Sequence, residues 1–157
     1  MANLTYAAGM KQMCIVLLLI SYVLAPTGAA PTKKRSLYHR LGGAYAISAL
    51  VDDFLDKLLK DPLVVQNPKV VAAMGNINVP GLKFHITNFV CAAAGGPEVY
   101  TGRDMAKSHK HLSITQAEWD ASVAILKQSL KDFDIKGPEG DEVLALIGSL
   151  QGQIVGK

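Results

Sequence analysis

The stretch PGLKFHITNFVCAAAGGPEVYTGRDMAKSHKHL, residues 80–112, decides how the rest of the chain is interpreted. Its first half predicts a helix over Pro80–Ala94, because apolar residues recur at the three- and four-residue spacing of one helical face. These residues are Leu82, Ile86, Phe89, Val90 and Ala93. Gly95-Gly96-Pro97 ends this helix abruptly. A loop over 98–103 then leads to Asp104, a suitable N-cap for a short helix that runs to Leu112.

Each of these two helices places one histidine among apolar residues. His85 follows Leu82 by three residues in the first helix, and His109 is flanked by Met105 and Leu112 in the second. Neutral imidazole is a good ligand for iron, and apolar side chains suit the faces of a porphyrin. The pair therefore predicts a haem site between the two helices. The alternative is an ordinary helical bundle that holds two buried histidines.

Outward from this stretch the pattern is helical, and no alternating run is long enough to make a sheet. Most of the predicted helices stop at Gly or Pro, and Thr115 with Glu118 forms a capping box at the start of a long one. The further helices are predicted over 37–41, 44–59, 67–74, from Thr115 to Phe133, and from Pro138 through Ile154. The fold class is all-α.

Composition excludes several classes of protein. Of the 157 residues 50% are hydrophobic and 18% are charged, which is typical of a folded domain. The net charge is +3 with both signs interleaved, whereas nucleic-acid-binding proteins usually carry a dense basic face. No Cys-x-x-Cys-His is present, so covalent c-type haem attachment is excluded. We expect Cys91 in the core and His39 and His111 on the surface.

Residues 1–30 are expected to be a secretory signal peptide. A short stretch ending in Lys11-Gln12 precedes the apolar run Met13–Ile20, and small residues follow at Thr27–Ala30. The apolar run is shorter than the about 20 residues that a membrane-spanning helix needs. This pattern predicts a secreted or periplasmic protein, with an uncleaved N-terminal membrane anchor as the alternative. Residues 31–36 are then a linker, and 37–157 form the domain.

Several stretches together resemble the group I truncated haemoglobins. They are Leu37–Gly43 followed by Ala46-Ile47, Phe89–Pro97, Tyr100–Met105, Ser108-His109 and Leu112–Thr115. They occur in the family's order, and both glycine pairs are in place. The resemblance implies a truncated globin-like two-over-two helical sandwich around haem b. It also implies that His109 is the proximal iron ligand, with its second ring nitrogen donating to a backbone carbonyl or to water. Arg103 is the first candidate to pair with a haem propionate, followed by Lys83 and Lys107.

The distal side departs from this family. Many relatives carry Tyr after the Phe near the end of the second helix, but here Leu55 follows Phe54. Where relatives often carry Gln, this chain has Leu82 and Ile86, and Met74 takes the place of an aromatic that clamps the haem. The remaining polar candidate is His85. We hypothesise that it ligates the iron directly and gives a resting bis-histidyl haem. In the alternative it turns to a propionate at the haem edge.

The resemblance implies reversible binding of a diatomic gas, O2, NO or CO, as the function. A haem enzyme is the first alternative, with nitric oxide dioxygenase or peroxidase-like chemistry and a reductase as partner. Electron transfer or redox sensing is the second, because bis-histidyl ligation suits an iron that does not change ligands. A cofactor-free helical interaction module ranks last.

Overall fold

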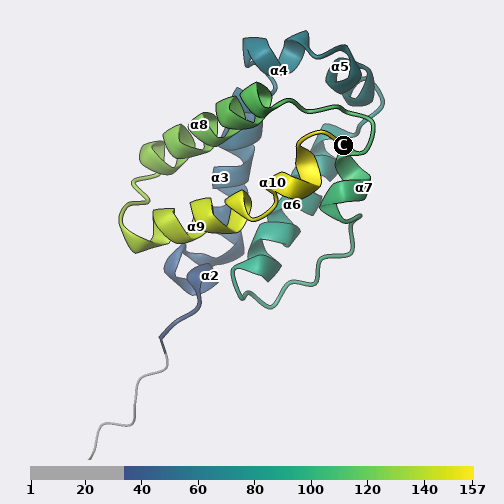
Figure 1. Cartoon of the computed structure of the whole chain (residues 1–157). Coiled ribbons are helices and arrows are strands. Elements are labelled where there is room, and N and C mark those ends of the chain that lie inside the picture. Colours follow the sequence, from purple (N-terminus) through teal and green to yellow (C-terminus); the bar gives the residue numbers. More distant parts are fainter. Residues whose placement is uncertain (1–33) are drawn as a thin grey trace, which may run out of the picture. The chain divides into compact units, whose positions relative to one another are not determined.

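Two pairs of long helices make up the part of the chain that the structure describes, residues 34–157 (Figure 1). The structure is a computed structural model, and Arg35–Lys157 form one unit in it. The predicted signal peptide and residues 31–33 of the predicted linker lie outside the described residues. Both therefore remain predictions.

The described helices keep the order expected from the sequence. They are α2 Leu37–Arg40, α3 Gly43–Leu58, α4 Pro62–Gln66, α5 Pro68–Met74, α6 Val79–Ala93, α7 Met105–His109, α8 Gln116–Asp132, α9 Pro138–Gly148 and α10 Gln151–Ile154. Within residues 34–157 the only β-pairing is an isolated parallel bridge between Ile114 and Val155. None of the described helices is long and apolar enough to cross a membrane.

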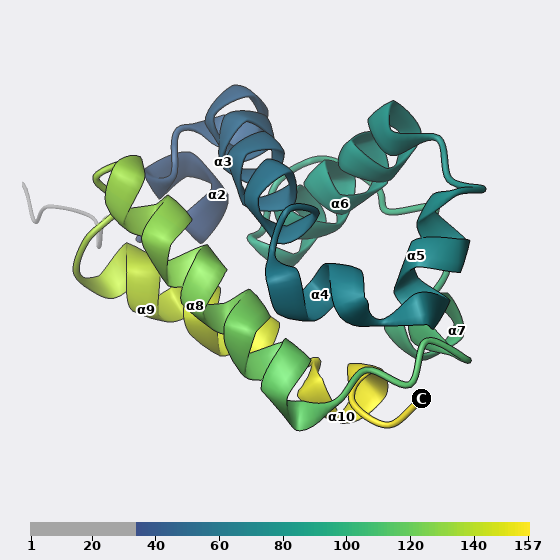
Figure 2. The same cartoon turned by 90° about the horizontal axis from the view of Figure 1, so that it is seen from above.

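The helices form a two-over-two arrangement. Helix α3 packs along α6, and α8 packs along α9, with α3 and α8 joining the two pairs (Figures 1 and 2). The short helices α4 and α5 connect α3 to α6, and α7 lies against α10 at the same end of the molecule as the C-terminus. The prediction of an all-α, two-over-two fold is confirmed.

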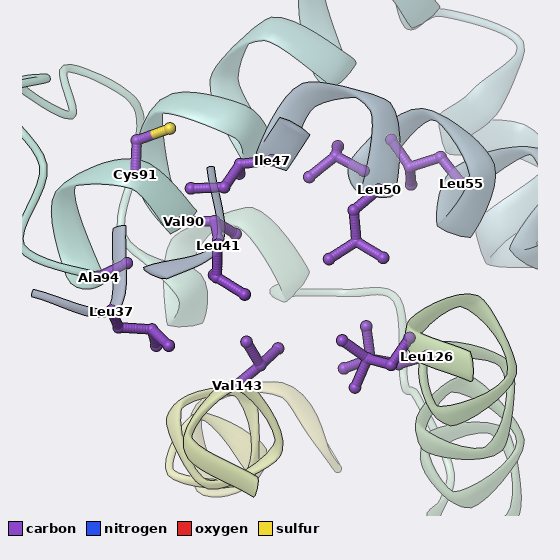
Figure 3. Close-up of a cluster of buried hydrophobic side chains, with 12 residues drawn as sticks. Leu37, Leu41, Ile47, Leu50, Leu55, Val90, Cys91, Ala94, Leu126 and Val143 are labelled. Atoms are coloured by element: carbon purple, nitrogen blue, oxygen red, sulfur yellow. The ribbon is translucent and has the colours of Figure 1, made fainter. Parts of the chain in front are cut away.

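The core lies where α3, α6, α8 and α9 meet (Figure 3). Ile47 of α3 and Cys91 of α6 are 1% and 0% exposed, so these two helices are in close contact. Burial raises the pKa of the Cys91 thiol to about 11, so it stays protonated and acts as a small core residue, as predicted. Ala93, predicted on the buried face, is exposed; Ala94 is buried in its place.

Ion pairs tie the helices together at the surface. Arg40 of α2 pairs with Glu139, at 2.7 Å, and with Glu142 of α9. Lys57 of α3 lies 2.6 Å from a carboxylate oxygen of Asp132 on α8. These contacts join elements that are distant in sequence, although exposed pairs contribute little to stability individually.

Helix ends agree with the sequence except at three places. Asp61-Pro62 ends α3 as predicted but also begins α4, because the Asp61 side chain accepts the N–H groups of Leu63 and Val64. The predicted last helix is in fact two, α9 and α10, separated at Ser149-Leu150. The hydroxyl of Ser149 donates to the carbonyl of Leu146 at this break.

The third difference concerns the short helix that carries His109. It was predicted to run to Leu112, but α7 ends at His109 because Lys110 is extended and His111 has φ +73°. Its predicted N-cap is present: the Asp104 carboxylate accepts the Lys107 N–H at 2.7 Å. His109 therefore lies at the last position of a helix of five residues.

Thr115 and Glu118 form the predicted capping box at the start of α8. Thr115 Oγ1 accepts the Glu118 N–H at 3.2 Å, and Glu118 Oε2 accepts the Thr115 N–H at 2.7 Å. Burial alone would raise the pKa of Glu118, but hydrogen bonds from Thr115 and Asn67 outweigh it and hold that pKa below its ordinary value. At pH values above the unfolded-state pKa of Glu118, the ionised carboxylate therefore stabilises the folded protein. This stabilisation is lost as the pH falls through the folded-state pKa, which is the lower of the two.

We expect Thr115→Ala to lower the free energy of unfolding by about 1 kcal/mol at neutral pH, because an N-cap side chain is lost. The difference from wild type should shrink in acid, where Glu118 is protonated in both proteins. Urea denaturation at neutral and acidic pH measures both effects. Thr115→Ser keeps the hydroxyl and serves as the control, and equal losses in the two variants would contradict the role of the box.

Candidate haem site

A cavity of about 620 Å³ lies between α3, α6, α7 and α8. Its walls are mostly apolar, which is typical of sites for cofactors and small molecules. All eight predicted site residues line it: Phe54, Leu55, Leu82, His85, Ile86, Arg103, Met105 and His109. Met74, predicted to replace a clamping aromatic, lines it as well. The structure thus brings residues from four separate segments to one place.

His109 presents one ring nitrogen to this cavity. Its Nδ1 lies 2.8 Å from the carbonyl oxygen of Met105, one turn earlier on α7. A carbonyl can only accept, so Nδ1 carries the proton and donates, and in the neutral imidazole Nε2 is then the unprotonated nitrogen. This is the backbone partner predicted from the sequence. It fixes both the tautomer and the orientation of the ring, as expected of a metal-ligating histidine.

His85 lies on α6 and contributes to another part of the cavity wall, beside Leu82 and Ile86. Its ring meets Phe84 edge-on, with centroids 5.6 Å apart. Among residues 34–157 it has no polar partner, and it is exposed rather than buried. His85 lines the cavity, as the helical spacing predicts, although its side chain is exposed. Leu82, Ile86 and Val90 share one stripe of α6: Val90 belongs to the buried core, Leu82 and Ile86 pack against it, and all three line the cavity.

The loop before α7 holds Arg103 at the cavity. The Tyr100 hydroxyl donates to the Arg103 carbonyl at 2.6 Å, and the Tyr100 ring packs edge-on against Phe89, with centroids 5.2 Å apart. A Cβ on Gly102 would lie only 2.4 Å from the Tyr100 hydroxyl, so a larger residue here would displace the Tyr100 ring. The Arg103 side chain is exposed and has no ion-pair partner among the described residues.

Comparison with known proteins places this geometry in a family. Residues 36–155 match the family described as bacterial-like globin. The chain is also 30% identical over 133 residues to the group 1 truncated haemoglobin LI410 of Chlamydomonas moewusii, a match that covers 82% of this chain and 74% of that protein. The chain belongs to the group 1 truncated haemoglobins. The predicted haem cofactor is confirmed by this membership.

Solved structures of truncated haemoglobins have the same fold. The Fe(III) form of the truncated haemoglobin from Tetrahymena pyriformis superimposes with a TM-score of 0.69 at 26% identity, covering 78% of this chain and all of that one. The 2/2 haemoglobin of a Synechococcus species, which has a covalently attached haem, gives a TM-score of 0.66 at 30% identity, covering 76% and 95% of the two chains.

The side chains of this truncated haemoglobin fit a haem group. The cavity offers apolar surface for the faces of the macrocycle and an imidazole whose free nitrogen is held in place through Met105. Polar groups are few in the wall. Glu118 is one of them, but its Oε2 already accepts hydrogen bonds from the N–H and the hydroxyl of Thr115.

The three cations predicted as partners of the propionates differ in their surroundings. Lys83 pairs with Asp52 and, at 2.8 Å, with Asp56 of α3. Lys107 pairs with Asp104 at 3.1 Å. Neither lysine lines the cavity, whereas Arg103 does. Of the three, Arg103 is therefore the one placed to meet a carboxylate at the cavity.

Several residues that line the cavity were not predicted to do so. Trp119, Ser122 and Val123 of α8 lie in the wall. Leu150, Ile154 and the short helices α4 and α5 also contribute. A helical stripe predicts burial, but it does not tell whether the buried face meets another helix or a cofactor.

Arg103→Gln should speed the loss of haem to an acceptor protein about fivefold, because an unpaired guanidinium is removed from the edge of the site. Lys83→Gln is the matched control and should leave the rate of haem loss near that of wild type, since the Lys83 ammonium already forms ion pairs with two carboxylates. The absorbance change on transfer measures both rates. A larger effect of Lys83→Gln would reverse this assignment.

Proposed function

We propose that this truncated haemoglobin holds haem b in the cavity through His109 and reversibly binds a diatomic gas, O2, NO or CO. The observation that carries the proposal is the free Nε2 of His109, fixed by the Met105 carbonyl at the wall of an apolar cavity. The haem iron, when bound, supplies the position at which a gas molecule binds. The protein supplies the ligand, the walls and the exclusion of water.

Different residues of the cavity would hold the iron and exclude water. His109 holds the iron and keeps one tautomer because Nδ1 donates to Met105. Phe54 and Leu55 of α3, with Met105, offer apolar contacts that exclude water from the site. No tyrosine stands after Phe54, so Leu55 provides no hydrogen-bond donor there.

We further propose that His85 holds the sixth position of the iron at rest and must move aside for a gas. Its position in the cavity wall and its lack of a polar partner among residues 34–157 support this. Without His85, this part of the wall is formed by Leu82 and Ile86, which offer no donor. Ligation by two histidines also makes electron transfer the second candidate function, because the iron then need not change ligands.

The surroundings of Glu118 argue against acid–base chemistry. Glu118 is the carboxylate in the cavity wall, but Oε2 accepts both the N–H and the hydroxyl of Thr115. Its low pKa keeps it ionised, so it does not supply a proton at neutral pH. For this reason we rank nitric oxide dioxygenase or peroxidase-like activity below gas binding.

Absorption spectra of the purified protein test the central proposal. The ferric, reduced and CO-treated reduced forms should each give a haem spectrum. His109→Gly should bind haem weakly, and added imidazole should restore the spectrum by replacing the missing side chain. A His109→Gly protein with the wild-type spectrum, or a wild-type protein that binds no haem, would overturn the proposal.

The role of His85 has a separate test. We expect His85→Leu to change the ferric spectrum from low-spin to high-spin and to speed CO binding, because no side chain must then leave the iron. His39→Leu is the matched control, since His39 is exposed on α2 and bonds Ser36. An unchanged ferric spectrum in His85→Leu would contradict ligation and favour the alternative at the haem edge.

A further inference from the structure

A second hollow, of about 500 Å³, lies beside α7 and shares no residue with the haem cavity. Helical spacing separates the two. Met105 and His109 lie on the face of α7 toward the haem cavity, and Ala106 and Lys107 lie on the other face. The second hollow is therefore distinct from the site of the proposed function.

Three segments of the chain bring lysine side chains to this hollow. Lys69 comes from α5, Lys107 and Lys110 come from α7 and the loop after it, and Lys157 comes from the C-terminal segment. His111 of the same loop also lines the hollow. No carboxylate side chain lines it.

The cations differ in how far they are already paired. Lys107 is partly neutralised by Asp104, 3.1 Å away. The Lys69 ammonium donates to the Ser113 hydroxyl at 2.7 Å but has no acidic partner among the described residues. The Lys110 ammonium has neither a hydrogen-bond nor an ion-pair partner within residues 34–157. The hollow thus has a net positive charge that this part of the chain does not balance.

The loop of the hollow has an unusual backbone. His111 and Ser113 have φ of +73° and +52°, in the left-handed region that glycine adopts at least cost. Both line the hollow with polar side chains that glycine would lack. The Ser113 N–H donates to the Lys157 carbonyl at 2.8 Å, which holds this loop against the C-terminal segment. Strain held in place at a site with converging polar groups is typical of ligand-binding loops.

We propose that this hollow binds a small polyvalent anion, a molecule with two or more phosphate or carboxylate groups. Lys69, Lys107 and Lys110 supply the charge, and His111 and Ser113 supply hydrogen-bond donors. The concave shape, formed by three segments, suits a compact ligand better than the flatter surface of an acidic protein. The proposal does not depend on haem binding.

Calorimetric titration of the full chain with sodium tripolyphosphate, and separately with citrate, tests this site at physiological ionic strength. We expect saturable binding of at least one of them at a single site. Lys69→Gln/Lys110→Gln should weaken it about tenfold or more, since two charge-assisted contacts are lost. Lys127→Gln/Lys131→Gln on α8 removes the same charge elsewhere and should leave the affinity unchanged.

Four results would overturn the proposal. Three come from the titrations: no saturable binding, equal weakening in both double variants, or tighter binding of poly-glutamate than of either small anion. The fourth is sedimentation with phosphatidylglycerol vesicles when neither tripolyphosphate nor citrate binds, because the anion would then be a membrane surface. His111→Gly adds an independent readout. It should weaken anion binding without lowering thermal stability, since glycine relieves the left-handed strain. An unchanged affinity in this variant would remove His111 from the site.

Discussion

The packing of α6 against α3 is the constraint on which the rest of this structure depends. Leu82, Ile86 and Val90 on one stripe of α6 both contribute to the core and line the cavity, and the neighbouring Cys91 is fully buried in the core. A small movement of this helix would therefore disturb the core and the site together. Close packing makes such movements costly, because interiors contain few voids that could absorb them. The side chain of Cys91 is fully buried in this core.

Local sequence signals accounted for most of the fold because they act within one turn. Asp104 and Thr115 cap α7 and α8 as predicted, since a side-chain oxygen at the N-cap reaches the free N–H groups whatever the tertiary context. Contacts across the fold were harder to predict. Helix α4 begins at a proline that was taken only as a stop, and the Gly148-Ser149 pair at the break between α9 and α10 was not taken as a helix end.

The residues of the site were predictable as a group, but their individual roles depended on tertiary neighbours. Lys83 and Arg103 are both cations near the apolar stretch, and nothing local separates them. In the structure Lys83 lies within reach of Asp52 and Asp56, a helix away and about thirty residues earlier in the chain, whereas Arg103 stays unpaired at the cavity. His85 shows the same limit: its helical spacing predicted an inward position but not its exposure. The family resemblance supplied what spacing could not, the role of His109.

The short helix α7 explains why the C-terminal segment matters to the site. An isolated helix of five residues does not hold its shape in water, because the cost of its first turn is not recovered over so short a length. The position of His109 must therefore come from contacts outside α7. The Asp104 cap fixes its start, α10 packs on it, and Gly156 and Lys157 bond the backbone of Ile114 and Ser113 just beyond its end. The Met105 carbonyl can orient the imidazole only because these contacts first hold the helix, so the last residues of the chain help to place the nitrogen that would meet the iron.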